Sequence, residues 1–289
     1  MTPYLYSALV VLFAGVVTSL PAPLAEPDNM VDMTHNLVGN DEMPKWPGHK
    51  KYTFTIENRG NYHGTGLYVE LNSISLSEHT ATHMDAAAHL GKPGNRRVHQ
   101  IPQRDLVSEA VVVDIREKAK ANREAELTVD DLKKWESKYG RIPNRAFVFM
   151  NSGWEQYWTN KTAFLGTKSF DDMNSLHYPG VSESATRWLI DERHVLAIGV
   201  DTISLDPSSS TTAGTHRYLL GEKNLFGFEM VANLNSLPPR GATVFAFPMK
   251  IYDGSGAPLR MFAFWNNAGC EFQPSAPLLV LIVLSVFLS

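Results

Sequence analysis

The run Ala110-Val-Val-Val-Asp-Ile115 is short, apolar and rich in β-branched residues, which is typical of a strand buried on both faces of a sheet. Runs of the same kind are Ala146–Met150, His194–Val200 and Ala242–Phe247. The segment Tyr68–Leu76 alternates apolar and polar residues instead, which predicts a half-buried strand. The chain is therefore expected to contain a sheet with several buried strands.

Helical patterns lie between these strands. Thr128-Val-Asp-Asp131 reads as a capping box that begins a helix through Tyr139, and Ser182–Ile190 begins another after the Pro179-Gly180 turn. Strands mixed with helices predict an α/β or α+β fold, and we adopt α/β, with a mixed β-sheet and flanking helices. No linker or internal repeat interrupts the chain, so residues 28–266 are predicted to form a single domain.

Composition limits the class of protein. The chain has 289 residues, of which 44% are hydrophobic and 19% charged, as expected of a globular protein with a substantial core. The net charge is −4, and the densest basic spots are the pairs Arg96-Arg97 and Lys133-Lys134. We therefore expect no nucleic acid partner.

The first residues differ from this average. Residues 4–20 are apolar and uncharged, and a Pro-containing segment follows them. The pattern predicts a secretory signal peptide over residues 1–25, although no Lys or Arg precedes the apolar run. A single membrane anchor is the alternative, but the run is at the lower length limit for crossing a bilayer.

The last residues are also apolar. Residues 277–289 carry no charge, and the small residues Asn266–Gly269 and a polar spacer precede them. This order predicts a signal for GPI attachment over residues 267–289, which would be removed together with the only cysteine, Cys270. The alternative is a C-terminal helix packed into the core. We thus expect an extracellular protein that meets the membrane only through a GPI anchor, with Asn160-Lys161-Thr162 as an N-glycosylation site.

A second stretch carries the chemistry: His79-Thr-Ala-Thr-His83-Met-Asp85-Ala-Ala-Ala-His89 holds three of the ten histidines of the chain. A straight strand would spread His79 and His83 about 13 Å apart, and a helix would point Asp85 away from His83. The donor atoms of a metal site must converge. We therefore predict a bend, with a loop leaving a strand that ends near Leu76 and Asp85 close to the start of a helix.

The residue types in this stretch suit a metal ion. Imidazole and carboxylate are the ligands expected for Zn, Mn, Fe or Ni, and small neighbours let the backbone fold tightly around an ion. Three unrelated histidines in a surface loop are the alternative. A nucleophilic Ser/His/Asp site lacks support, because no G-x-S-x-G motif occurs, and no glycine-rich nucleotide-binding motif is present.

At this point the sequence resembles the cyclase family of metal-dependent hydrolases, which includes kynurenine formamidase and isatin hydrolase. The family pattern H-x-G-T-H-x-D-x-P-x-H matches residues 79–89. Further matching blocks follow in order: Asp32–His35, Trp46–Gly48, Asn151–Trp158, Tyr178–Ser182, Gly199–Asp206, Thr215–Leu220, Glu229–Leu234 and Gly254–Pro258. The resemblance covers nearly the whole domain and implies a swivelling β/β/α-like fold that assembles as a dimer or a higher homo-oligomer.

The resemblance also implies roles for individual residues. The metal ligands would be His79, His83, Asp85, His216 and Glu229, holding one or two divalent ions, with Zn or Mn expected. His89 would be the general acid/base and Trp46 would line the substrate pocket. Asp201 would orient a ligand from outside the first coordination sphere, or cap a turn.

Two residues depart from the family pattern. Ala81 replaces the motif glycine, which predicts backbone strain if that position needs a positive φ. Ala87 replaces the proline and leaves the loop before His89 less restrained. Neither change removes a ligand, but both leave the substrate and the rate open.

These groups support hydrolysis of an amide-like carbon–nitrogen bond by activated water. We therefore predict an arylformamidase that converts N-formylkynurenine to kynurenine and formate. Two alternatives stay open: hydrolysis of an isatin-type lactam or another extracellular amide or lactone, and a secreted metal-bearing binding protein without activity.

Overall fold

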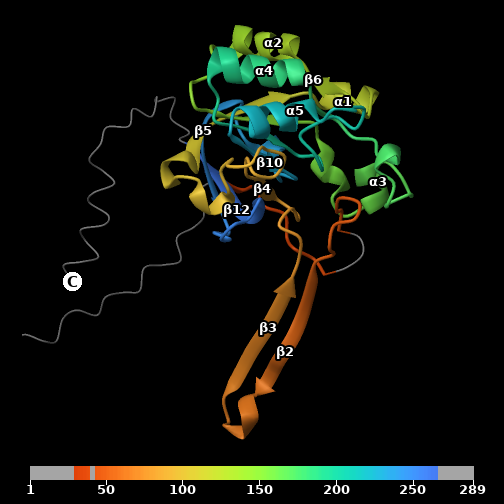
Figure 1. Cartoon of the computed structure of the whole chain (residues 1–289), viewed down its shortest axis with the longest axis vertical. Coiled ribbons are helices and arrows are strands. Elements are labelled where there is room, and N and C mark those ends of the chain that lie inside the picture. Colours follow the sequence, from red (N-terminus) through yellow and green to blue (C-terminus); the bar gives the residue numbers. More distant parts are fainter. Residues whose placement is uncertain (1–28, 40–42, 266–289) are drawn as a thin grey trace, which may run out of the picture.

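The computed structural model describes residues 29–39 and 43–265, so the predicted segments 1–25 and 267–289 lie outside it. The chain is built on an eight-stranded sheet with the order β1-β12-β11-β5-β7-β9-β10-β4 (Figure 1). Its strands are β1 (Met30–Asp32), β4 (His83–Asp85), β5 (Val107–Asp114), β7 (Phe147–Asn151), β9 (Ala197–Val200), β10 (Phe226–Glu229), β11 (Arg240–Pro248) and β12 (Gly256–Phe264). Because β12 also pairs with β4, the sheet curls until seven of its strands form a closed ring.

The middle of this sheet is parallel. The pairs β5–β7, β7–β9 and β9–β10 run in the same direction, which requires crossover segments between them. Two of these crossovers contain the helices α2 (Val129–Tyr139) and α4 (Glu183–Arg193), which cover one side of the sheet (Figure 1). Thr128 and Ser182 cap them, as predicted. The mixed sheet with flanking helices confirms the predicted fold class.

Alternation along the buried strands divides the core into two clusters. In β7, Phe147 and Phe149 point into the closed ring, whereas Val148 and Met150 face the helices. Both sides of the strand are buried, which explains why its sequence is continuously apolar. A third cluster is rich in aromatic residues and includes Trp154, Trp158 and Tyr178.

Strand β4 is short but central to the site. It lies between β10 and β12, and its register places His83 opposite Glu229 and Asp85 opposite Gly227. All three of its residues are buried. The curled sheet therefore brings residues from distant parts of the chain around one short strand.

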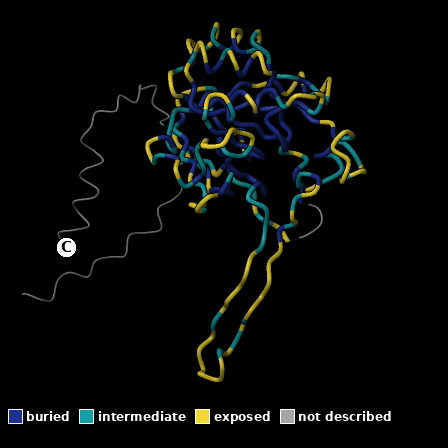
Figure 2. The backbone as a smooth tube through the Cα atoms, viewed as in Figure 1, coloured by how far each residue is buried: buried dark blue, intermediate teal, exposed yellow. Residues whose placement is uncertain are grey.

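A two-stranded arm projects from this body. It consists of β2 (Thr53–Asn61), the turn η1 (Tyr62–Gly64) and β3 (Tyr68–Ser75), and it is exposed along most of its length (Figures 1 and 2). The predicted strand over Tyr68–Leu76 is confirmed as a strand. The prediction that it is half-buried is wrong, because six of the eight residues of β3 are exposed and none is buried.

The remaining elements are short. They are α1 (Arg116–Ala121), α3 (Lys161–Leu165), α5 (Gly214–His216), the strand pair β6 (Glu126–Leu127) and β8 (Gly180–Val181), the π-helical turn η6 (Arg217–Glu222), and the 3₁₀ turns η2 (Val98–Gln100), η3 (Gln103–Asp105), η4 (Trp154–Tyr157), η5 (Met173–Ser175) and η7 (Leu234–Ser236). Among the described residues, none of the helices has the length and apolar character needed to cross a membrane.

Candidate metal centre

The segment between the arm and β4 bends sharply, as the convergence of its histidines requires. The bend lies at Ala81, which has a φ of 52°. Non-glycine residues rarely adopt this left-handed conformation, so the strain expected at this position is present. The prediction that Asp85 lies near a helix start is wrong, because Asp85 is the last residue of β4.

The small neighbours of the histidines hold this bend by hydrogen bonds. The hydroxyl of Thr80 donates to the carbonyl of Ser77 over 2.7 Å, and that of Thr82 donates to the carbonyl of Met230 over 2.6 Å. The amide of His35 in turn donates to the Thr82 hydroxyl. Thr side chains therefore fasten the loop to the strand end after β10 without adding bulk next to the imidazoles.

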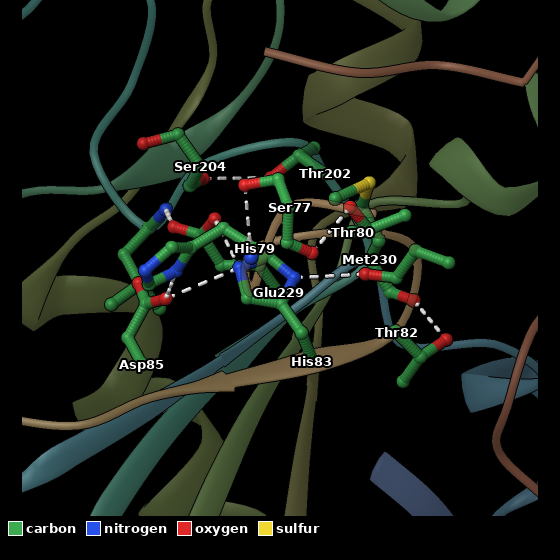
Figure 3. A network of polar contacts seen from close by, with 12 residues as sticks. Ser77, His79, Thr80, Thr82, His83, Asp85, Thr202, Ser204, Glu229 and Met230 are labelled. Carbon is green, nitrogen blue, oxygen red and sulfur yellow. Dashed lines mark hydrogen bonds and ion pairs between the residues drawn. The ribbon is translucent and has the colours of Figure 1, made fainter. Parts of the chain in front are cut away.

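Three of the predicted ligands meet at this bend (Figure 3). Nδ1 of His79 lies 2.6 Å from Oδ1 of Asp85, and Nε2 of His83 lies 3.1 Å from the same oxygen. Nδ1 of His83 donates to the carbonyl of Ala81 over 2.8 Å. Because that bond places the proton on Nδ1, the Nε2 atom of neutral His83 presents its lone pair to the site.

The two predicted ligands from the later part of the chain join them. Nε2 of His216 lies 3.3 Å from Oδ2 of Asp85 and 3.1 Å from Oε1 of Glu229. Oε2 of Glu229 lies 3.5 Å from Nε2 of His83, and Figure 3 shows the Glu229 carboxylate turned toward the imidazoles. The structure thus brings together all five side chains that the resemblance implied as ligands.

The donor set fits a divalent cation. Nε2 of His83 and Oδ2 of Asp85 are buried and have no hydrogen-bond partner, although unsatisfied buried polar atoms are costly. Two groups have donor atoms within 4.8 Å of one another: His79, His83 and Asp85, and Asp85, His89 and His216. Both groups contain Asp85, so the geometry suits one ion or a pair bridged by that carboxylate.

The charges in the site are interdependent. Burial disfavours the charged form of Asp85, but the interaction of the carboxylate with the neighbouring His89, His83 and His79 in their protonated forms outweighs burial and holds the pKa of the carboxyl well below its usual range. Burial opposes the protonation of His216, yet its hydrogen bond to Asp206 and the nearby carboxylates of Asp85 and Glu229 raise its pKa well above the usual value. The Asp85 carboxylate is therefore ionised at neutral pH, as a metal ligand must be.

His89 lies at the open side of this cluster. Its ring centroid is 3.8 Å from that of His79 and 6.0 Å from that of His216, and it is more exposed than the other histidines of the cluster. Burial lowers the pKa of His89 to about 4, against the charge of Asp85 and with a further contribution from His79. The imidazole is thus neutral at pH 7 and able to accept a proton.

The carboxylate that orients a ligand is Asp206 rather than Asp201. Oδ2 of Asp206 accepts the Nδ1 proton of His216 over 2.5 Å and also the His216 amide over 3.1 Å. Asp201 instead accepts from the amides of Ser152 and Trp154, so its predicted contact with a ligand is not found. Asp206 is the last residue of the Gly199–Asp206 block that matches the family pattern. Its place in that block was the one sequence feature that could have pointed to this role.

An aromatic cluster lies beside the centre. Trp46 packs against a group of buried residues that contains Ala81, Trp158 and Tyr178. Sequence reasoning gave no role to two histidines nearby: His35 stacks on Trp158 with the ring centroids 4.0 Å apart, and His49 lies 6.1 Å from His79. The position of Trp46 is compatible with its predicted place in a substrate pocket.

Asn160 lies away from the centre. Its side chain accepts a hydrogen bond from the amide of Ala163 and caps α3 at an exposed position. Its glycosylation stays a prediction.

Known proteins with similar sequences belong to the family that the motifs indicate. The family model Cyclase, described as "Putative cyclase", matches residues 31–207. Isatin hydrolase from Roseibium aggregatum is 29% identical over 220 residues, which cover 74% of this chain and 81% of that protein. Kynurenine formamidase from Salinibacter ruber is also 29% identical, over 219 residues that cover 74% of this chain and 88% of that protein.

Solved structures agree with this match. Isatin hydrolase A from Labrenzia aggregata, bound to benzyl benzoate, superposes with a TM-score of 0.74 at 32% identity, covering 82% of this chain and 93% of that one. An isatin hydrolase bound to the product analogue thioisatinate gives a TM-score of 0.73 at 27% identity, covering 81% and 91%. The similarity therefore extends to the fold of most of the described domain.

Proposed function

The chain belongs to the cyclase family, and on that premise we propose that it is a hydrolase that cleaves the carbonyl–nitrogen bond of a small aromatic amide. The observation that carries the proposal is the convergence of His79, His83, Asp85, His216 and Glu229 on one point, with the neutral His89 beside them. Imidazole and carboxylate donors in this number form a hydrolytic metal site, and His89 adds a proton carrier.

A divalent cation bound by these five side chains would activate water and stabilise the oxyanion that develops on the carbonyl. The protein's own contribution is to fix the donors. His83 is oriented by the Ala81 carbonyl, and His216 is oriented by Asp206. Two ligands of this kind cannot rotate away from the site without breaking a buried hydrogen bond.

His89 is the proposed acid/base. As a neutral imidazole it takes a proton from the attacking water, and as an imidazolium it returns that proton to the leaving nitrogen. The carbonyl–nitrogen bond breaks as the new carbonyl–oxygen bond forms, and the products are a carboxylate and an aromatic amine. His89 is only partly buried, which supports a role in proton transfer to a substrate that enters from solvent.

The aromatic cluster supports an aryl substrate. Trp46 lies partly buried in the group that contains Ala81, which is two residues from His83. An aromatic amine next to the scissile bond would stack on such a ring. N-formylkynurenine, the substrate predicted from the sequence, presents a formyl carbonyl bonded to this type of amine.

Isatin-type lactams are the second candidate, and one observation favours them. Isatin hydrolase from Roseibium aggregatum and kynurenine formamidase from Salinibacter ruber are each 29% identical to this chain, but solved isatin hydrolase A structures from Labrenzia aggregata and Ralstonia solanacearum also superpose on it with a TM-score of 0.74. Isatin also presents a carbonyl bonded to an aromatic amine, closed into a ring. The same residues would open that ring with the same proton transfers.

The test is to assay N-formylkynurenine and isatin side by side with the purified protein loaded with Zn or Mn. We expect turnover of one of them, and a fall in kcat of about 10²- to 10⁴-fold in His89→Ala. The control is His99→Ala, because His99 lies elsewhere, where its ring contacts Tyr252. Loss of activity in His89→Ala with metal still bound would support the proposed role.

The opposite results have separate meanings. A folded, metal-loaded protein that turns over neither substrate would contradict the aryl amide proposal and favour a binding protein or a hydrolase of another amide or lactone. Activity that survives in His89→Ala would contradict the role of His89 alone.

A further inference from the structure

A serine contacts His79 on the side of the ring that faces away from Asp85. Nε2 of His79 lies 3.0 Å from Oγ of Ser255, while Nδ1 of the same ring lies 2.6 Å from Oδ1 of Asp85. Ser255 directly precedes β12 and belongs to the Gly254–Pro258 block, for which no role was predicted. Both nitrogens of this buried imidazole are thus engaged, one toward the candidate metal centre and one toward the serine.

Ser255 is itself held by Glu78. The Ser255 hydroxyl donates to Oε2 of Glu78 over 2.7 Å, and the Ser255 amide donates to the same oxygen over 2.9 Å. A serine hydroxyl carries only one proton. Because that proton is donated to Glu78, Oγ of Ser255 can only accept a hydrogen bond from the imidazole. The bond between Ser255 and His79 must therefore be donated by Nε2 of His79.

The direction of this bond fixes the tautomer of His79. With its proton on Nε2, the neutral imidazole presents a lone pair from Nδ1. Nδ1 then faces the Asp85 carboxylate, which is also an acceptor, and two acceptors at this distance repel each other unless a proton or a cation lies between them. His83 and His216 have the opposite arrangement, since their Nδ1 atoms donate hydrogen bonds elsewhere in the protein and leave Nε2 for the centre.

The two glycines that flank Ser255 make these contacts possible. A Cβ atom at Gly254 would lie 3.1 Å from Oε1 of Glu78, and one at Gly256 would lie 2.5 Å from Cε1 of His79. Side chains at either position would displace one of the two partners. The Gly-Ser-Gly order therefore lets both Glu78 and His79 come within hydrogen-bond distance of one hydroxyl group.

We propose that Ser255 and Glu78 are positioning residues of the metal centre. Glu78 orients the Ser255 hydroxyl, and Ser255 holds His79 in the tautomer that binds a divalent cation through Nδ1. Asp206 orients His216 directly, whereas Glu78 orients His79 through a serine. This proposal rests on the metal centre of the proposed function and extends it by naming the residues that orient His79.

The direct test determines which nitrogen of each histidine carries a proton in the full chain, prepared with isotope-labelled histidine and loaded with Zn. Proton–nitrogen correlation spectra report this for each ring. We expect His79 to bind Zn through Nδ1 and to carry its proton on Nε2, and His83 to bind through Nε2. Ser255→Ala should make the Nε2 proton of His79 exchange faster with water, an effect that a merely structural serine would not have.

Metal affinity gives the second measurement, by competition with a chelator. Ser255→Ala and Glu78→Ala should each weaken Zn binding by about 10- to 100-fold. Because Glu78 acts through Ser255, the double variant should bind no more weakly than Ser255→Ala alone, whereas independent residues would give additive losses. Glu78→Gln keeps an oxygen that can accept from Ser255, so it should recover part of the affinity lost in Glu78→Ala.

Ser73→Ala is the matched control. Ser73 also donates to a glutamate, Glu57, over 2.6 Å, but this pair lies on the exposed arm, so Zn affinity should not change. Circular dichroism checks that each variant is folded. The spectra of the wild-type chain decide the tautomer of His79 even where an alanine variant does not fold.

Four results would overturn the proposal. They are Zn bound through Nε2 of His79, unchanged Zn affinity in Ser255→Ala, additive losses in the double variant, and a folded chain that binds no Zn. Turnover is measured separately. A chain with the expected tautomer and affinities that hydrolyses neither N-formylkynurenine nor isatin would contradict the proposed function and still support the roles of Ser255 and Glu78.

Discussion

At the scale of single residues, Asp206 illustrates how the centre is held. Its carboxylate accepts three hydrogen bonds from adjacent residues: from the amides of Thr215 and His216 and from Nδ1 of His216. An amide at this position would turn an N–H group toward at least one of these donors. The imidazole of His216 would then lose its fixed orientation toward Asp85 and Glu229.

We therefore predict that Asp206→Asn lowers the affinity for Zn or Mn by about 10- to 100-fold. Competition with a chelator of known affinity measures this change. Asp172→Asn is the control, because Asp172 also accepts from a backbone amide but lies on an exposed turn. Unchanged metal affinity in Asp206→Asn would show that His216 is either held by other groups or is not a ligand.

Asp201 gives a prediction about pH. Burial raises the pKa of Asp201 to about 6, although Ser152 and Trp154 donate hydrogen bonds to its carboxylate. Between about pH 4 and pH 6 the folded protein therefore holds a proton that the unfolded chain has lost. The contribution of Asp201 to stability is full below the unfolded pKa and is lost as the pH rises through about 6.

The change in unfolding free energy across this window is up to about 3 kcal/mol, because the pKa of Asp201 rises from its usual value of 3.8 to about 6. Asp201→Asn removes the ionisation, so the difference in unfolding free energy between wild type and variant should shrink as the pH rises from 4.5 to 6.5. Urea unfolding at several pH values measures it. A difference that is constant with pH, or that grows as the pH rises, would contradict the raised pKa.

The candidate ligands could be predicted from the sequence at this scale, but the residues that orient them by hydrogen bonds could not. His79, His83 and Asp85 stand close together in the sequence among small residues, so their chemistry is visible in one line of text. The bond between Asp206 and His216 also spans few residues, but a carboxylate in a turn has many uses. Only the structure shows which of Asp201 and Asp206 faces an imidazole.

At the scale of elements, the pairing of β4 with β12 sets the position of His79. Gly256 begins β12 opposite Asp85. A Cβ atom at Gly256 would lie 2.5 Å from Cε1 of His79 and 2.7 Å from the carbonyl oxygen of Met84. Both distances are far below ordinary contact, and the second atom is backbone, so the strand or the imidazole would have to move.

Gly256→Ala should consequently displace His79 and weaken metal binding by at least about 10-fold, since ligand geometry controls affinity. Isothermal titration with Zn measures the loss. Gly39→Ala is the matched control, because its added methyl group would meet no atom closer than 3.9 Å. Wild-type affinity in Gly256→Ala would show that the β4–β12 junction yields without moving the ligand.

Elements were predicted better from long patterns than from short ones. The capping residues Thr128 and Ser182 and the apolar runs of β5, β7 and β9 identified their elements correctly. The bend at Ala81 depends on one backbone angle, and the strand β4 on pairing with two distant strands, so neither left a periodic signal. The alternation of apolar and polar residues in the arm predicted a strand, but it did not predict that this strand is mostly exposed in the described structure.

At the scale of the whole molecule, the centre joins parts of the chain that are far apart in sequence. His79 to Asp85 follow the arm, His216 belongs to α5, and Glu229 ends β10. The ligands therefore come from β4 and the loop before it, from the helix α5 and from the strand β10. An ion bound to all of them would be present only in the folded state, so its binding free energy adds to the stability of the entire domain.

Removal of the metal should lower the melting temperature by about 6–12 °C. This range follows from about 3 kcal/mol of stabilisation at a metal concentration 100 times the Kd, and from about 2–4 °C per kcal/mol for a domain of this size. Calorimetry of the protein with Zn, with Mn and with a chelator measures it, and Asp206→Asn should show a smaller difference because its affinity is lower. Nε2 of His83 and Oδ2 of Asp85 are buried and have no hydrogen-bond partner in the described structure. A melting temperature that does not respond to the chelator would mean that a metal ion does not bind these two atoms.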